Sequence, residues 1–170
     1  MLWGDQDPVL KAPAGCFVTL HALRNHGLRG CVGRIEATQP LVEALRSASK
    51  QVLRDPRFAD DPVRLEELPL LEIEVSVLSA PRPAATPLDF EPLQHGIHLT
   101  IGSRSGCFLP QVAQETGWTR EQLLDRLCTE KMGLAPSAWR NPQAHLSVFS
   151  VLIVGPEPFD PSAIGPNWKT

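Results

Sequence analysis

Two side chains able to do chemistry, an arginine and a cysteine with one glycine between them, lie in the stretch Leu-Arg-Gly-Cys-Val-Gly at 28–33. The neighbouring residues predict a β-strand, and alternate side chains of a strand share a face. Arg29, Cys31 and Gly33 then point the same way, which places a fixed cation beside a thiol and leaves space for a ligand over the bare glycine. Because a nearby cation favours the thiolate, Cys31 is the cysteine with a reason to be reactive.

The preceding strand carries Thr19 and His21, and an Arg-Asn-His-Gly turn joins the two arms into a hairpin. A three-residue loop ending at Gly27 places His21 opposite Cys31, whereas a four-residue loop places Leu20 there. A one-residue slip turns every side chain to the other face. The sequence leaves both registers open.

Other polar candidates follow later in the chain. His95 could serve as a base for the thiol. It precedes His98 by three residues, a spacing that puts the two rings on opposite faces of a strand, and His145 alone completes no metal site, so no metal ligands are assigned. Gln111 follows a strand end, and Lys131 ends a helix. The candidate catalytic residues are Cys31, Arg29 and His21, and the candidate ligand-binding residues are Thr19, Gly30, Gly33, His95, Gln111 and Lys131.

Two other interpretations of the Arg-Gly-Cys stretch stay open. In the first, the strand is only tightly packed, and Arg29 ties down a loop or an acid such as Asp55 or Glu72. In the second, the stretch docks another protein.

The elements that must position these residues alternate without a regular βαβ rhythm. Hairpins dominate, which predicts an α+β domain with a mostly antiparallel sheet and packed helices. In the strand at 71–77, apolar and polar residues alternate, which predicts one buried and one wet face. A proline-rich crossing loop occupies 81–92. Strands are predicted at 15–23, 28–35, 71–77, 97–101, 107–109 and 146–154, and helices at 110–116, at 119–132 and between the cap Thr38 and Asp55.

Composition narrows the class of protein. Apolar residues make up 42% and charged residues 21% of the 170 residues, as in one globular domain. The formal charge of −3 disfavours nucleic acid as a partner. Neither a membrane-spanning run nor a secretory signal is present, so the cytoplasm is expected, with the four cysteines as free thiols. No cofactor motif is found. The predicted organisation is a poorly specified segment 1–14, one domain at 15–160 and a tail at 161–170.

Six blocks in chain order resemble the AMMECR-one family, also called AmmeMemoRadiSam system protein A. The resemblance covers roughly residues 15 to 160. The blocks are Gly-Cys-Phe-Val-Thr-Leu at 15–20 with the Leu-Arg-Gly-Cys-Val-Gly signature at 28–33, Asp-Pro-Arg-Phe at 55–58, Leu-Glu-Ile-Glu-Val-Ser-Val-Leu at 71–78, His-Gly-Ile at 95–97, Leu-Pro-Gln-Val-Ala at 109–113, and Lys-Met-Gly-Leu at 131–134 with Trp139.

The resemblance implies a domain with a larger and a smaller lobe, a cleft lined by the signature, and a pathway shared with a Memo-like protein and a radical-SAM enzyme. It also implies a helix before the first strand, which residues 1–14 do not predict. The leading hypothesis is an enzyme or enzyme component for a small anionic substrate. Arg29 would orient the anionic group, Cys31 would act as nucleophile or proton donor, and His21 or His95 would act as base.

The alternative is a non-catalytic binding or scaffold module that docks those partner proteins. It predicts an exposed apolar patch, for which the tail residues Phe159, Ile164 and Trp168 are the candidates.

Overall fold

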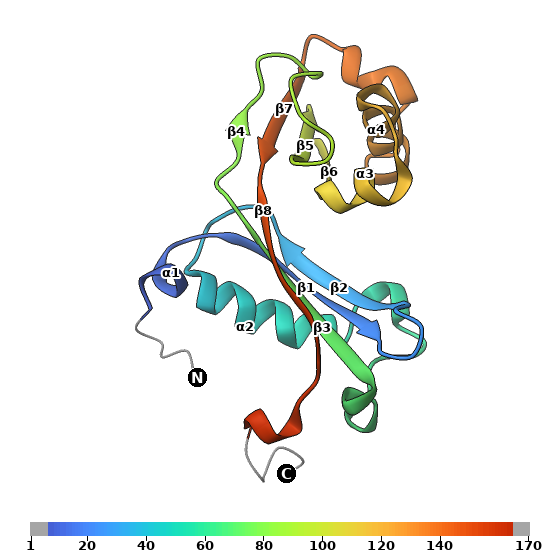
Figure 1. The fold of residues 1–170 in the computed structure, drawn as a ribbon. Helices are drawn as coiled ribbons and strands as arrows, with labels where there is room; N and C mark the ends of the chain where they lie inside the picture. Colours follow the sequence, from blue (N-terminus) through green and yellow to red (C-terminus); the bar gives the residue numbers. More distant parts are fainter. Residues whose placement is uncertain (1–6, 165–170) are drawn as a thin grey trace. The chain divides into compact units, whose positions relative to one another are not determined.

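The computed structural model describes residues 7–164, and the chain divides into two compact units. Unit 2 is the continuous stretch Leu78–Val151, and unit 1 is formed by the residues before and after it. Each unit has its own four-stranded sheet (Figure 1). The hairpin β1–β2 of unit 1 and the pairs β5–β6 and β5–β7 of unit 2 are antiparallel. The predicted α+β class is therefore confirmed.

The sheet of unit 1 has the strand order β2-β1-β3-β8, and α2 packs against β1 and β2. One face of α2 is buried because Leu41, Ala44, Ala48 and Val52 recur at helical spacing. The helix begins two residues later than the predicted Thr38 cap implies, with Pro40 at its N-cap and without a side-chain cap. The elements of unit 1 are α1 (Pro8–Lys11), β1 (Gly15–Ala22), β2 (Leu28–Arg34), α2 (Leu41–Val52), η1 (Pro56–Phe58), η2 (Leu65–Leu70), β3 (Leu71–Leu78), β8 (Val151–Pro158) and η5 (Pro161–Ile164).

Strand β3 departs from the predicted pattern of one buried and one wet face. Glu72 and Ser76, expected in water, are only 5% and 1% exposed, whereas Val75 and Val77 on the apolar side are half-buried. The Glu72 carboxylate accepts a hydrogen bond from the exposed His26 ring, which gives the buried charge a partner. The apolar side is only partly covered, because Val75 and Val77 pack against core clusters that include residues of α2 but also line an open groove beside that helix.

Unit 2 has the strand order β4-β7-β5-β6 and a core that includes Leu99, Leu124 and Val148. Two predictions are corrected here. The strand expected at 146–154 is two strands in different sheets, divided at Ser150, and the crossing loop contains a short edge strand. The elements are β4 (Arg82–Pro83), β5 (Gly96–Ile101), β6 (Arg104–Phe108), α3 (Pro110–Thr116), α4 (Arg120–Arg126), η3 (Leu127–Lys131), η4 (Pro136–Arg140) and β7 (Ala144–Phe149).

The predicted helix at 119–132 is confirmed with its start and its end. The Thr119 hydroxyl accepts from the Gln122 amide, and the Gln122 side chain accepts from the Thr119 amide, as the capping box requires. A π-helical turn follows α4, and the chain leaves it at Gly133, where φ is +62°. Within residues 7–164 no helix has the length and apolar character needed to cross a bilayer.

Candidate functional site around Cys31

Cys31 lies on β2 opposite Thr19, so neither predicted register is correct. The pairing shifts between Leu20 and His21, which leaves Arg29 as the extra residue of a β-bulge on the opposite strand. The pair nearest the turn is His21 with Leu28, so six residues connect the strands instead of three or four, and this is why both predicted registers were wrong. The Thr19 hydroxyl donates a hydrogen bond to the Cys31 thiol, with Oγ1 and Sγ 3.3 Å apart.

Arg29 is held by two acids and is largely enclosed. Its Nε and Nη2 donate to the two carboxylate oxygens of Glu67 at 2.5 and 3.1 Å, and Nη2 also lies 3.3 Å from Asp61 Oδ2. Only 12% of its side chain is exposed, and its guanidinium carbon lies 5.7 Å from the centre of the Phe58 ring. The hydrogen bond that Arg29 donates to Glu67 is the main cause that raises the pKa of Arg29. Arg29 therefore ties η2 and the loop before it to β2, through acids other than the two named from the sequence.

A second arginine, Arg57, lies beside Cys31. Its Nη2 donates to the backbone oxygen of Cys31 at 2.9 Å, and Nη2 and Nε donate to the two carboxylate oxygens of Asp55 at 2.6 and 3.1 Å. More than half of its side chain, 54%, is exposed. Electrostatic interaction with Cys31 is among the causes that raise the pKa of Arg57, after the hydrogen bond with Asp55. Arg57 therefore takes the position beside the thiol that the sequence analysis gave to Arg29.

Asp55 completes a clamp on the backbone of Cys31. Its Oδ2 accepts from the Cys31 amide at 2.9 Å, while Arg57 binds the carbonyl of the same residue. The carboxyl is 3% exposed, and its hydrogen bond with Arg57 is the main cause that lowers its pKa to about 2. Because β2 is an edge strand, these side chains satisfy peptide groups that a further strand would otherwise bind. We call Asp55 and Arg57 the clamp.

The two glycines of the signature permit close packing of the backbone. A Cβ atom at Gly30 would lie 2.8 Å from the carbonyl oxygen of Val52 in α2. A Cβ atom at Gly33 would lie 2.1 Å from the carbonyl oxygen of Cys16 and 2.7 Å from the Phe17 ring. The space beside each glycine is therefore filled by protein atoms.

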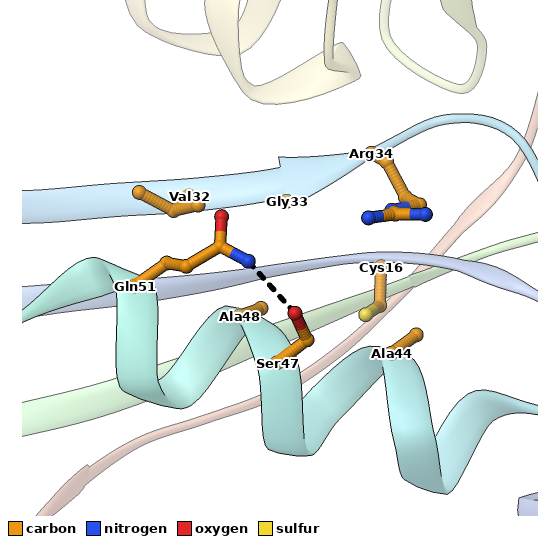
Figure 2. A pocket seen from close by; sticks show the side chains of 8 residues that line it. All are labelled: Cys16, Val32, Gly33, Arg34, Ala44, Ser47, Ala48 and Gln51. Atoms are coloured by element: carbon orange, nitrogen blue, oxygen red, sulfur yellow. Dashed lines mark hydrogen bonds between the residues drawn. The ribbon is translucent and has the colours of Figure 1, made fainter.

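A small cavity lies on the α2 side of the signature strand, next to Gly33 and Arg34 (Figure 2). Its volume is about 20 Å³, enough for about one water molecule. Ser47 and Gln51 of α2 line it, and Gln51 Nε2 donates to Ser47 Oγ at 2.7 Å. A substrate larger than water has no room there.

Each of the remaining candidates has its own surroundings. His21 pairs with Leu28, two positions from Thr19 along β1, and its Nδ1 lies 3.2 Å from the carbonyl oxygen of His26. His95, Gln111 and Lys131 belong to unit 2. His95 Nδ1 accepts from the Glu91 amide at 3.0 Å, the buried Gln111 Oε1 has no hydrogen-bond partner, and Lys131 Nζ lies 5.7 Å from the centre of the Phe108 ring. Within the described ranges, no cluster of three residues could hold a metal ion.

The clamp has a signal in the sequence, the Asp-Pro pair at 55–56, which was not among the predicted site residues. Asp-Pro is typical of a cap, in which the aspartate accepts from the amide two residues later. Asp55 Oδ1 does accept from the Arg57 amide, at 3.0 Å. That local bond fixes the Asp-Pro-Arg turn and turns both charged groups toward Cys31.

Comparison with known proteins shows which sequences and which fold the chain is similar to. The sequence model of the AMMECR1 family matches residues 2–154. A protein of Thermococcus gammatolerans is 39% identical over 158 residues, which cover 88% of this chain and 76% of that protein. A protein of Methanopyrus kandleri is 39% identical over 153 residues, which cover 85% and 72%. The crystal structure of the uncharacterized protein PH0010 from Pyrococcus horikoshii matches with a TM-score of 0.78 and 36% identity, over 90% of this chain and 78% of that one.

Proposed function

The chain belongs to the AMMECR1 family, and from the groups around Cys31 we propose that it binds a small anionic substrate between the Arg57 guanidinium and the Cys31 thiol. It would act as an enzyme or enzyme component in a pathway with Memo-like and radical-SAM proteins. The observation that carries the proposal is the pairing of a half-exposed arginine with a partly exposed thiol on one strand edge. Arg57 replaces Arg29 in the role of anion binder, because 54% of the Arg57 side chain is exposed, whereas Arg29 is 12% exposed and is bound by two acids.

Thr19 and the clamp give the thiol a defined orientation. A sulfur that accepts the Thr19 hydroxyl hydrogen is presented as an electron-pair donor, the polarity that a nucleophile needs. The clamp fixes the Cys31 backbone at both its amide and its carbonyl. A guanidinium binds carboxylate or phosphate groups through its N–H donors, so a substrate with either group beside an electrophilic carbon fits the pair.

The experiment compares alkylation of each cysteine by iodoacetate, which is anionic, and iodoacetamide, which is neutral. Mass spectrometry on folded protein gives the rate at each site, and Cys107, also partly exposed, is the internal reference. We expect the iodoacetate-to-iodoacetamide rate ratio to be higher at Cys31 than at Cys107. Replacing Arg57→Gln should lower the ratio at Cys31 by about fivefold, since a charge a few ångströms away contributes roughly 1 kcal/mol near a surface.

Two further variants separate charge from folding. Arg57→Lys retains the cation and should retain most of the ratio, whereas Arg24→Gln removes an exposed arginine of the hairpin turn and should leave the ratio unchanged. Equal ratios at Cys31 and Cys107, unaffected by Arg57→Gln, would refute an anion site at the thiol.

Exposed apolar residues on β8 favour a second candidate function, a non-catalytic module that docks those partner proteins. Leu152 and Val154 are 65% and 55% exposed. Of the tail residues expected in such a patch, Phe159 is half-buried, and the Ile164 side chain and Trp168 lie outside the described residues. Gel filtration of the chain with each partner at micromolar concentration tests this function, and a failure to co-elute counts against it.

A further inference from the structure

Unit 1 contains an apolar groove that is separate from the clamp and Cys31. Its floor is formed by Val75 and Val77 of β3 and by Leu152 and Val154 of β8, and the flank of α2 forms one wall. The volume is about 770 Å³. A folded chain that leaves such large apolar side chains in water normally covers them with a partner.

The dimensions of the sheet indicate what fits the groove. α2 packs against β1 and β2, one half of the four-stranded sheet (Figure 1). Neighbouring strands lie about 4.8 Å apart, and packed helices lie about 8–10 Å apart. Two strand spacings therefore equal one helix spacing. A second helix beside α2 would lie over β3 and β8, where the groove is, and would complete the helical layer on the sheet.

The charges on the groove indicate which kind of helix fits. The polar residues that line it, Arg46, Ser49 and Lys50, all come from α2. None of the described lining residues is acidic, although the whole chain carries a net charge of −3. A docked helix therefore meets apolar strands on one side and two cations along its flank.

We propose that the groove binds an amphipathic α-helix of a partner protein, with an apolar stripe against β3 and β8 and acidic residues beside α2. This inference goes beyond the Cys31 proposal, does not depend on it, and names the partner chemistry for the docking function. A second copy of the chain is a poorer occupant. Among the described helices only α2 and α4 with its π-helical turn exceed seven residues, and the apolar face of each is already buried in its own unit.

Fluorescence anisotropy with a labelled 18-residue helical peptide tests the proposal. The peptide has leucines at positions i, i+3, i+4 and i+7 with glutamates on both flanks, and a matched peptide carries lysines in place of the glutamates. We expect the glutamate peptide to bind the full chain at micromolar concentration and about tenfold more tightly than the lysine peptide. The double replacement Leu152→Ser with Val154→Ser should weaken binding by about tenfold or more.

Matched variants establish where the peptide binds. Ile153→Ser alters an exposed residue of the same strand that does not line the groove, so binding should be unchanged. Lys50→Glu should abolish the preference between the two peptides, because it leaves one cation and one anion beside the groove. Arg24→Glu, on the hairpin turn and outside the groove lining, should leave the preference unchanged. The Cys31 alkylation ratio should be unaffected by Leu152→Ser, so the two proposals fail independently.

Three results would overturn the proposal. The first is equal affinity for the two peptides, or equal losses from Ile153→Ser and from the double replacement. The second is self-association in sedimentation velocity that Leu152→Ser abolishes, which would assign the groove to a second copy. The third is that dodecanoate displaces the peptide at the concentration at which dodecanoate itself binds, and that the Lys50→Glu variant still binds dodecanoate. This result would indicate a site for acyl chains.

Discussion

The carboxylate of Asp55 offers the sharpest test of the clamp. In Asp55→Asn an amide oxygen can still accept from the Cys31 amide, but the charge that pairs with Arg57 is lost. The folded-state pKa of Asp55 is about 2, against an ordinary value of 3.8. A depressed pKa contributes stability above the unfolded pKa, and the contribution is lost as pH falls through the folded pKa. The difference amounts to about 2.5 kcal/mol at pH 7 and about 1.3 kcal/mol at pH 3.

Urea unfolding followed by far-ultraviolet circular dichroism at several pH values between 3 and 7 measures this contribution. The free energy of unfolding of Asp55→Asn should fall below that of the original chain by about 2 to 3 kcal/mol at pH 7, and the gap should narrow by about half at pH 3. Asp61→Asn is the control, because that carboxylate is 74% exposed and its replacement should cost under about 0.5 kcal/mol. A gap for Asp55→Asn that is the same at pH 3 and pH 7 would refute the electrostatic account of the clamp.

Three further outcomes follow from the same region. Glu67→Gln should lower the free energy of unfolding by about 1 to 2 kcal/mol, because it leaves the enclosed Arg29 with only the exposed Asp61 as a charged partner; an unchanged urea midpoint would contradict this. Gly33→Ala should destabilise unit 1 by about 2 kcal/mol or more, because the new methyl group meets the Cys16 carbonyl, and a melting temperature within one degree of the original would count against it. Burial raises the pKa of the Cys16 and Cys128 thiols, so both should stay unalkylated in folded protein at pH 7; mass spectrometry showing modification at the rate of a free thiol would be inconsistent with that burial.

Much of the fold was predictable because it is encoded locally. The helices predicted at 119–132 and between Thr38 and Asp55 depend on residues only a few positions apart, and both were confirmed. Features that depend on residues far apart in the sequence were not predicted. The burial of Glu72 depends on a histidine 46 residues away in sequence, and the division at Ser150 depends on the strand passing from one sheet to another. Periodicity carries no information on either.

The candidate site was predictable only in part, for a related reason. The strand, the thiol and a cation close to it were all predicted from one short stretch. The β-bulge, however, removes the regular alternation that would have placed the Arg29 side chain beside Cys31. The bulged residue is Arg29 itself, bound to acids more than thirty residues away. The cation beside the thiol is contributed by Arg57, from a turn whose local pattern was visible but whose position against β2 was not.

The division of the chain has a consequence for its synthesis. Unit 2 is continuous, whereas the sheet of unit 1 lacks β8 until residues after Val151 have been made. At ribosomal rates of about 5–20 residues per second, the interval between Val77 and Leu152 lasts on the order of 4 to 15 s. During that time β3 is an unpaired apolar edge, while unit 2 has its full sequence sooner and can fold first. We therefore expect unit 2 to fold first on the ribosome, and we expect aggregation to be greatest for nascent chains stalled before β8.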